Sequence, residues 1–195
     1  MNRPSPDSER HGKIGNSPVA IGRYTYGEEN LKVKEWGEGA TLRIGSFCSI
    51  AANVTCFLGG NHRTDWITTY PFGHIFGEQM GIDPVKGHPK TNGDIIIGND
   101  VWIGSNVTIM SGITIGDGAV ISANSHVIKD IGRYTIAGGN PAQEIKRRFS
   151  NEVVDLLLKL SWWELPLTQI KTIHHDLTKE PNLETLKLLI KDLGL

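Results

Sequence analysis

Aliphatic residues recur at every sixth position through the second half of the chain. The residue after the aliphatic is very small at four of the six repeats, namely Gly98, Gly104, Gly116 and Ser122. Neither an α-helix nor an ordinary strand has a period of six, whereas the short strands and corners of a β-solenoid repeat at such fixed intervals. The aliphatic positions, which we expect to point inward, are Ile97, Ile103, Ile109, Ile115, Ile121 and Val127.

A second small or aliphatic residue follows each of these positions four residues later, from Val101 to Ile131. The same signal resumes upstream at Ile44, Cys48 and Ile50, and it supports a β-helix over residues 13–148. A sandwich or barrel of short strands is disfavoured, because turn signals there recur every 8–12 residues. The small residues let the backbone turn where a Cβ atom would crowd it.

Other segments depart from this period. Residues 1–12 are polar and predict an N-terminal tail, and a charged interruption runs from Glu28 to Glu38. The period also stops between Gly59 and Asp94, where glycine, proline, histidine and aromatic residues mix. A connection of this length inside a compact domain is uncommon and usually functional, so we expect a protruding loop over residues 59–94.

Residues 149–195 change to a helical pattern. Two apolar faces at helical spacing predict helices that cap the open end of the solenoid, with Ser150 or Asn151 as an N-cap of the first. We expect the neighbouring Trp162 and Trp163 to pack rather than to bind a cofactor. The apolar faces are Val153, Leu156, Leu157 and Leu160, and then Leu183, Leu186, Ile190 and Leu193.

Composition narrows the function classes. The 20 basic and 21 acidic residues give a net charge of −1, which offers no electrostatic reason to expect nucleic acid or an anionic membrane as partner. No apolar run is long enough to span a bilayer and the polar start is unlike a signal peptide, so the expected location is cytoplasmic. Cys48 and Cys56 fall in inward positions and predict buried structural thiols rather than a disulfide or a zinc site.

Three longer stretches carry a resemblance to a known family. They are Gly60–Arg63 with Thr69–Phe72 following, then Ile97–Gly104, then Ala137–Ala142 with Arg148-Phe149 and the paired tryptophans. In this order they resemble the xenobiotic acetyltransferase branch of the hexapeptide-repeat family, which includes type B chloramphenicol and virginiamycin (streptogramin A) acetyltransferases. The resemblance covers most of residues 40–165. It implies a left-handed parallel β-helix, a homotrimer with active sites between subunits, and acetyl-CoA as co-substrate without a metal.

His62 matches the catalytic histidine of that family. An imidazole near its ordinary pKa of about 6.5 suits removal of a hydroxyl proton near neutral pH. The sequence offers no nucleophile with a paired base, so direct transfer is favoured over an acyl-enzyme. The expected activity is direct acetyl transfer to a hydroxyl of a small molecule, with His62 as general base. Either Asp65 or a backbone carbonyl could orient its ring. We expect His74 and His88, which match no family role, to be surface or loop-packing residues.

The resemblance also implies a track for the co-substrate. Corner backbone groups of a parallel solenoid can pair with the amides of the pantetheine arm, and tiny residues permit close approach. Trp102 matches a residue that packs against this arm near the thiol. The remaining positions implied by the family pattern are the track residues Gly104, Ser105, Ser122 and Ala123, and the phosphate-facing cations Lys129, Lys146 and Arg147.

The acceptor is less constrained. Asn61 and Arg63 could shape the loop or touch the acceptor, and aromatic residues could form an apolar wall around it. Streptogramin-acetylating relatives carry a longer aromatic insertion where this chain has the short stretch 28–37, so a sugar or chloramphenicol fits at least as well as a macrocycle. The predicted wall residues are Trp36, Tyr70, Phe72 and Phe76.

Three alternatives stay open. An N-acetyltransferase of an amino sugar has a similar need for a base. A non-catalytic β-helix that serves as scaffold would have no affinity for coenzyme A. A γ-type carbonic anhydrase shares the solenoid but needs a cluster of zinc-ligating histidines, and the repeats offer only His126.

Overall fold

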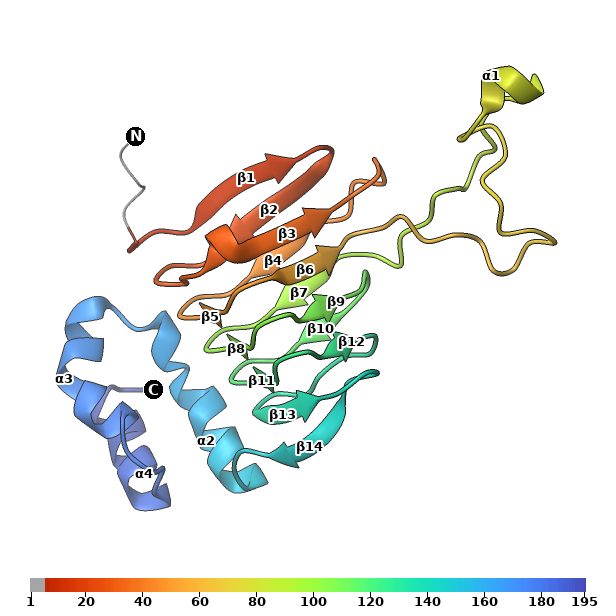
Figure 1. Cartoon of the computed structure of the whole chain (residues 1–195). Coiled ribbons are helices and arrows are strands. Elements are labelled where there is room, and N and C mark those ends of the chain that lie inside the picture. Colours follow the sequence, from red (N-terminus) through yellow and green to blue (C-terminus); the bar gives the residue numbers. More distant parts are fainter. Residues whose placement is uncertain (1–5) are drawn as a thin grey trace.

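The body of the protein is a stack of coils with three faces, seen in a computed structural model that describes residues 6–195 (Figure 1). The three central coils contribute one short strand to each face, and strands of successive coils pair in parallel. Face 1 contains β2 (Ser17–Ile21), β4 (Leu42–Ile44), β7 (Ile95–Ile97) and β10 (Thr114–Ile115). Face 2 contains β5 (Ser49–Ile50), β8 (Trp102–Ile103), β11 (Val120–Ile121) and β13 (Thr135–Gly138). Face 3 contains β3 (Leu31–Lys34), β6 (Val54–Phe57), β9 (Thr108–Ile109) and β12 (His126–Val127).

The interior follows the predicted pattern. The six aliphatic residues at six-residue spacing are at most 2% exposed, so their inward orientation is confirmed. The second slot is buried as well, with Val101, Val107 and Ala119 at most 1% exposed. Successive side chains of a strand point to opposite faces, so each two-residue strand places one side chain in the core and one on the surface.

Three corners join the faces, and each has its own character. The helix corner joins faces 1 and 2 through turns 22–24, 45–47, 98–100, 116–118 and 132–134. The open corner joins faces 2 and 3 through turns 51–53, 104–106 and 122–124. The loop corner joins faces 3 and 1 through turns 110–112 and 128–130, and through the protruding segment, residues 58–94.

Small residues at the corners are required by the distance between coils. A Cβ atom on Gly104 would lie 2.6 Å from the amide nitrogen of Ala123 in the next coil. The third residue of many corners has a positive φ, for example 59° at Asn106 and 60° at Asn124, and asparagine tolerates this conformation better than most residues. The six-residue period therefore reflects backbone contact at the corners as much as the filling of the core.

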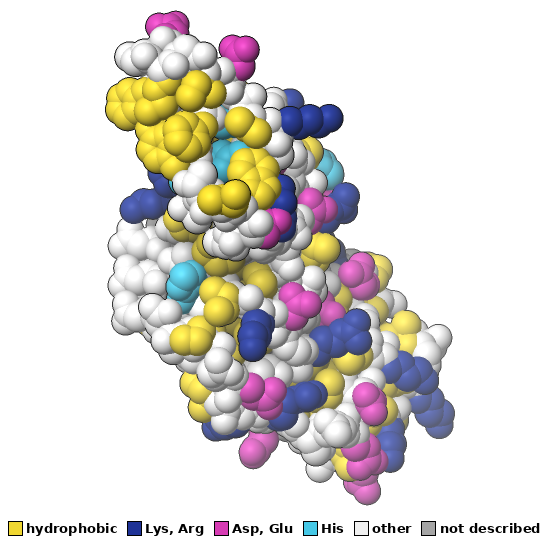
Figure 2. Space-filling model, turned by 90° about the vertical axis from the view of Figure 1, so that its right-hand side faces the viewer, with side chains coloured by type: hydrophobic (Ala, Val, Ile, Leu, Met, Phe, Trp, Pro, Cys, Tyr) yellow, Lys and Arg dark blue, Asp and Glu magenta, His cyan; other side chains and the backbone are white. Residues whose placement is uncertain are grey.

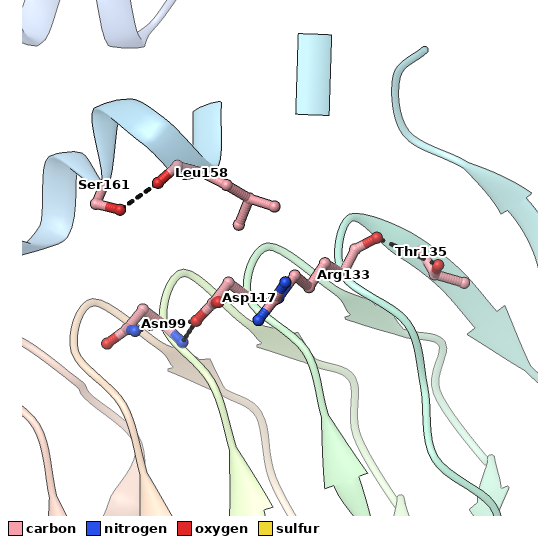
Figure 3. Close-up of polar contacts among 6 residues, drawn as sticks. All are labelled: Asn99, Asp117, Arg133, Thr135, Leu158 and Ser161. Atoms are coloured by element: carbon pink, nitrogen blue, oxygen red, sulfur yellow. Dashed lines mark hydrogen bonds and ion pairs between the residues drawn. The ribbon is translucent and has the colours of Figure 1, made fainter. Parts of the chain in front are cut away.

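Side chains at the helix corner form a polar ladder between coils (Figure 3). The Asp117 carboxylate accepts hydrogen bonds from the backbone nitrogen of Asn99 at 2.8 Å and from its Nδ2 at 3.0 Å. Arg133 lies one coil further, with its Nε 3.7 Å from the other carboxylate oxygen of Asp117. Asn99 in turn accepts from the backbone nitrogen of Ser46 at 2.8 Å. The backbone N–H groups of Ser46 and Asn99 at this corner are thus satisfied by side chains.

Antiparallel strands flank both ends of the coil stack. β1 (Arg10–Ile14) pairs with β2, and β14 (Gln143–Arg147) pairs with β13. β1 begins inside the segment predicted as a polar tail, because a hairpin strand uses main-chain pairing and its side chains stay mostly exposed. Residues 1–5 of that predicted tail lie outside the described residues. The charged interruption likewise contains the 3-10 turn η1 (Glu28–Asn30) and β3.

The C-terminal segment forms α2 (Asn151–Leu160), the 3-10 turn η2 (Trp162–Glu164), α3 (Leu167–Leu177) and α4 (Leu183–Asp192). Ser150 caps α2 by accepting a hydrogen bond from the Val153 nitrogen, and Asn182 caps α4. No helix among residues 6–195 is long and apolar enough to cross a membrane.

The placement of these helices differs from the expected cap on the open end. They lie along the helix corner, where Trp162 packs on Phe47 at 4.7 Å between ring centroids. Arg23, in the first coils, donates to the carbonyl of Trp163 at 2.8 Å. The apolar helix faces find aromatic side chains at this corner, including Tyr134 and Phe149, while β14 covers the last coil. The expected packing role of the tryptophans is confirmed, with Trp163 only 4% exposed.

The protruding segment leaves the body between β6 and β7 and contains one helical turn, α1 (Gly77–Met80), at its tip (Figure 1). Its two arms are joined where they leave the body, because Asn61 and Lys90 exchange two backbone hydrogen bonds of 2.9 Å. None of its hydrophobic side chains beyond Leu58 is buried. The segment is held at its base and depends on local contacts elsewhere.

Candidate active site

The base of the protruding segment is fixed to the body by side chains as well as by backbone. The Asn61 amide donates to the Ser111 hydroxyl at 3.1 Å, and that hydroxyl also accepts from the Asn92 nitrogen. Trp36 covers Gly60, where a Cβ atom would lie 2.5 Å from the indole ring. Of the predicted acceptor-binding residues, Asn61 and Trp36 therefore sit at the root of the segment, and the Asn61 amide contacts the body.

His62 follows directly in this fixed base, and its side chain is exposed. Its Nδ1 lies 2.7 Å from the Thr69 carbonyl oxygen. A carbonyl only accepts, so Nδ1 carries the proton and Nε2 is the basic nitrogen. No residue of the described chain hydrogen-bonds Nε2. The ring is oriented by one nitrogen and presents the other to solvent, which is the arrangement that a general base needs.

Asp65 does not orient His62. Its carboxylate is paired with Arg63, whose Nε donates at 2.7 Å, and the Arg63 guanidinium lies 4.9 Å from the centre of the Trp66 ring. The hydrogen bond from Arg63 lowers the pKa of Asp65 to about 2. The backbone carbonyl of Thr69, rather than the Asp65 carboxylate, therefore orients the His62 ring. Arg63 contacts Asp65 and Trp66 within the protruding segment.

Two further histidines adjoin His62. The rings of His62 and His88 meet edge to face, with centroids 4.8 Å apart and planes at 88°, and the centroid of the His74 ring lies 5.1 Å from that of His88. Both ring nitrogens of His88 are buried without a hydrogen-bond partner. Burial lowers the pKa of His88, and the neighbouring His62 and His74 lower it further. His88 therefore packs within the loop, one of the two roles expected for it, and the sequence did not indicate that His62 is its partner.

Aromatic residues form a small hollow beside this cluster. Tyr70 and Phe72 meet edge to face at 4.8 Å. The hollow has a volume of about 130 Å³ and is lined by Trp66, Thr68, Tyr70, Pro71, Phe72, Val85 and His88. Figure 2 shows the apolar side chains gathered over the protruding segment. Two of the predicted wall residues thus share a hollow, while Phe76 lies at the start of α1 and is 59% exposed.

The open corner carries backbone donors that are unpaired within the described part of the chain. The N–H groups of Ser105 and Ala123, stacked in successive coils, have no hydrogen-bond partner among residues 6–195. Gly104 and Ser122 precede them and donate to the next coil, so they hold the corner in place. The four predicted track residues are therefore brought together, and they present unpaired donors of the kind that an amide carbonyl of a ligand could accept from.

The other residues predicted for the co-substrate are more dispersed. Trp102 projects from face 2, 56% exposed, between Ser49 and Val120. Lys146 and Arg147 lie on β14, paired with the end of β13 nearer the helix corner, and Lys129 lies at the loop corner. Within one chain the structure does not bring these three cations to one place.

The two halves of the predicted site occupy different corners of the same chain. His62 and the aromatic hollow belong to the loop corner, whereas the track residues belong to the open corner on the other side of face 3. A single chain separates them by the width of that face.

Comparison with known proteins decides the family. A family model for the bacterial transferase hexapeptide (six repeats) matches residues 94–129. A probable macrolide acetyltransferase of Lysinibacillus sphaericus is 51% identical over 150 residues, which cover 76% of this chain and 83% of that protein. A chloramphenicol acetyltransferase of Escherichia coli is 40% identical over 172 residues, covering 82% and 81%, and a virginiamycin A acetyltransferase of Staphylococcus aureus is 42% identical over 165 residues, covering 79% and 74%. The chain belongs to the hexapeptide-repeat xenobiotic acetyltransferase family.

Because the chain belongs to this acetyltransferase family, the protein is an acyltransferase. Its two cysteines are not suited to act as nucleophiles. Cys48 and Cys56 are free, fully buried thiols, as predicted. Burial raises the pKa of Cys48 to about 11 and that of Cys56 to about 12, so neither is a thiolate at neutral pH. Among residues 6–195 no cluster of three or more histidine, cysteine or acidic side chains has a metal-binding arrangement.

Proposed function

We propose that the protein is an acetyl-CoA-dependent O-acetyltransferase that acts on a hydroxyl of a small molecule, either an antibiotic or a sugar. The observation that carries this proposal is the His62 ring, which is oriented by the Thr69 carbonyl at 2.7 Å and has its Nε2 unpaired. The family membership supplies the reaction class, and this histidine supplies a base positioned for it.

In the proposed reaction the acceptor oxygen attacks the thioester carbonyl carbon while His62 Nε2 takes the hydroxyl proton. The carbon–sulfur bond then breaks, and the leaving thiolate receives that proton from the imidazolium, so the base is regenerated. The Thr69 carbonyl stabilises the charged ring through the Nδ1 proton. The inert thiols Cys48 and Cys56 are consistent with direct transfer without an acyl-enzyme.

The open corner is the proposed seat of the pantetheine arm. Its unpaired N–H groups at Ser105 and Ala123 can donate to the amide carbonyls of the arm, and Gly104 allows close approach. Trp102, exposed on the adjoining face 2, can pack along the arm. We assign the anionic nucleotide end to the exposed cations Lys129, Lys146 and Arg147, which would have to come from more than one chain to act together.

The proposed assembly is a homotrimer of left-handed β-helices with its active sites between chains. His62 and the open corner lie on different corners of one chain, so a neighbouring chain can supply the missing half of each site. Closed cyclic symmetry also consumes exposed apolar surface, and the protruding segment carries much of it, including Ile67 and Phe76.

The relatives narrow the acceptor class. Their names include macrolide, chloramphenicol and virginiamycin A acetyltransferases. The aromatic hollow formed by Tyr70 and Phe72 suits an acceptor with an apolar part. Asn61 and Trp36, at the root of the segment, complete the proposed acceptor surface.

The proposed function is tested by release of free coenzyme A thiol from acetyl-CoA. The acceptor panel contains a macrolide, chloramphenicol, streptogramin A, neutral sugars and amino sugars. Release that depends on one hydroxyl acceptor, with an O-acetyl product by mass spectrometry, is the expected result. An N-acetyl product would support the amino-sugar alternative. No release, together with no binding of coenzyme A in calorimetry, would contradict the enzyme proposal and favour a scaffold.

A further inference from the structure

His88 lies on the returning arm of the protruding segment, beside His62 on the outgoing arm. The segment leaves the body at Asn61 and returns at Lys90, and these two residues exchange backbone hydrogen bonds of 2.9 Å. His62 follows the first and His88 precedes the second by two residues. The backbone ladder therefore sets the two imidazoles beside each other, 4.8 Å apart and nearly perpendicular.

The His88 nitrogens make this contact unusual. A neutral imidazole carries one donor and one acceptor, and leaving both buried and unpaired costs free energy. A phenylalanine at this position, or a polar side chain turned to solvent, would avoid this cost. Hydrogen bonding within the described chain therefore does not account for His88, whereas its ring contacts the rings of both His62 and His74.

The surroundings of His88 keep it uncharged next to the base. Burial lowers the pKa of His88 most, the neighbouring His62 and His74 lower it further, and the Glu38 carboxylate raises it more weakly. The lowered pKa of His88 favours the neutral form of its ring. A neutral ring can therefore hold His62 without competing for the proton that His62 removes from the acceptor.

We propose that His88 is a positioning residue that holds the His62 ring, by its edge-to-face contact, in the orientation that bonds Nδ1 to Thr69 and presents Nε2. This inference rests on the proposed role of His62 as base. Thr69 fixes one nitrogen of the ring but leaves rotation about that hydrogen bond, and the His88 ring removes this freedom. A small misplacement of a catalytic group can cost roughly 100-fold in rate.

The test compares His88→Ala, which removes the contact, with His88→Phe, which keeps an aromatic ring without nitrogens. His74→Ala is the matched control, because His74 also contacts His88 but has no ring contact with His62. We expect His88→Ala to lower kcat by roughly 10- to 100-fold with an unchanged KM for acetyl-CoA. His88→Phe should recover most of kcat, and His74→Ala should stay within about twofold of the wild type.

A second readout does not depend on finding the acceptor. Nitrogen NMR of ¹⁵N-histidine-labelled protein reports the tautomer of His62 directly. We expect a single Nδ1-protonated tautomer in the wild type and in His88→Phe, and a mixture in His88→Ala. A His88→Ala variant that is folded, keeps the single tautomer and keeps kcat within twofold would overturn the inference, as would failure of His88→Phe to restore either readout. A wild type that holds the tautomer yet transfers acetyl to no acceptor would instead contradict the proposed function.

Discussion

The coil body and the protruding segment differ in how far their side chains are buried. In the body almost every inward side chain is fully buried and every coil repeats the same backbone contacts, as at Ile103 and Gly104. In the segment no hydrophobic residue beyond Leu58 is buried, and Ile67 is entirely exposed. The body therefore supplies the stability, while the segment presents the histidines and aromatic rings at little cost to the core.

This contrast also separates what stability and activity measurements should report. A substitution in the body should act through folding, because it removes core contacts. A substitution in the segment should act through the reaction, because its side chains contribute few buried contacts. Four predictions test this separation, from the largest expected effect to the smallest.

Replacing the base should have the largest effect. His62→Ala removes the group that accepts the hydroxyl proton, and we expect turnover to fall by roughly 10²–10⁴-fold. The melting temperature and the affinity for coenzyme A should not change, because the His62 side chain is exposed and is not among the groups proposed to hold coenzyme A. Thiol-release kinetics, thermal unfolding and calorimetry measure the three quantities. His11→Ala, which removes an exposed imidazole from β1, is the control, and near wild-type turnover in His62→Ala would rule out this base.

A core truncation in the body should cost stability. Ile103 is 0% exposed, so Ile103→Ala leaves a cavity among neighbouring coils and should lower the free energy of unfolding by about 2–5 kcal/mol. Met80→Ala at the tip of the segment should change it by less than about 0.5 kcal/mol, since Met80 is 44% exposed. Chemical denaturation of both variants gives the comparison. Equal losses would mean that the segment belongs to the same cooperative unit as the core.

A smaller effect is expected from the pH dependence at the helix corner. Burial raises the pKa of Asp100 to about 6, against partial compensation by Arg148. The unfolded chain loses this proton near pH 4, so the folded state binds more protons between these values, and this residue's contribution to stability falls as pH rises from 4 to 6.

Asp100→Asn removes that contribution and keeps a residue that tolerates the φ of 55° found there. The melting temperature of the variant relative to wild type should rise from pH 4 to pH 6 and level off above. A difference that is constant over this range would mean that the Asp100 carboxyl titrates alike in both states.

The smallest effect is expected from thiol modification. Cys48 and Cys56 are fully buried and un-ionised at neutral pH, so a water-soluble disulfide reagent should label neither in the native protein. Both should react after denaturation. Rapid labelling of the native protein would show that the coils open locally near these residues.

The sequence predicts the body better than the site. Regular spacing determines the inward residues, because each coil repeats one backbone geometry, and the helical faces of residues 149–195 follow from their own periodicity. The position of α2–α4 along the helix corner does not follow, since it depends on single aromatic contacts such as Trp162 with Phe47. The sequence does not predict β3, because its lysines alternate with aliphatic residues and face solvent, so the segment reads as a charged interruption.

Within the candidate site, motif resemblance predicts His62 and the track residues, but not what surrounds them. The Thr69 carbonyl is a backbone group, and its position cannot be predicted from the type of residue that carries it. The contact between His62 and His88 joins the two arms of an aperiodic segment, so neither hydrophobic spacing nor a local motif encodes it. The backbone pairing of Asn61 with Lys90, which creates that contact, is visible only in three dimensions.

The central claim is that His62 of one chain works at the open corner of another. Its direct test mixes two inactive proteins, His62→Ala and Ala123→Trp, where the second covers the corner with a bulky side chain. The two are unfolded together in equal amounts, refolded, and measured by thiol release against each variant refolded alone. If sites form between chains, random assembly leaves both halves intact in about a quarter of the sites, and that fraction of wild-type activity should return. Folded mixed oligomers without any recovered activity would contradict the account.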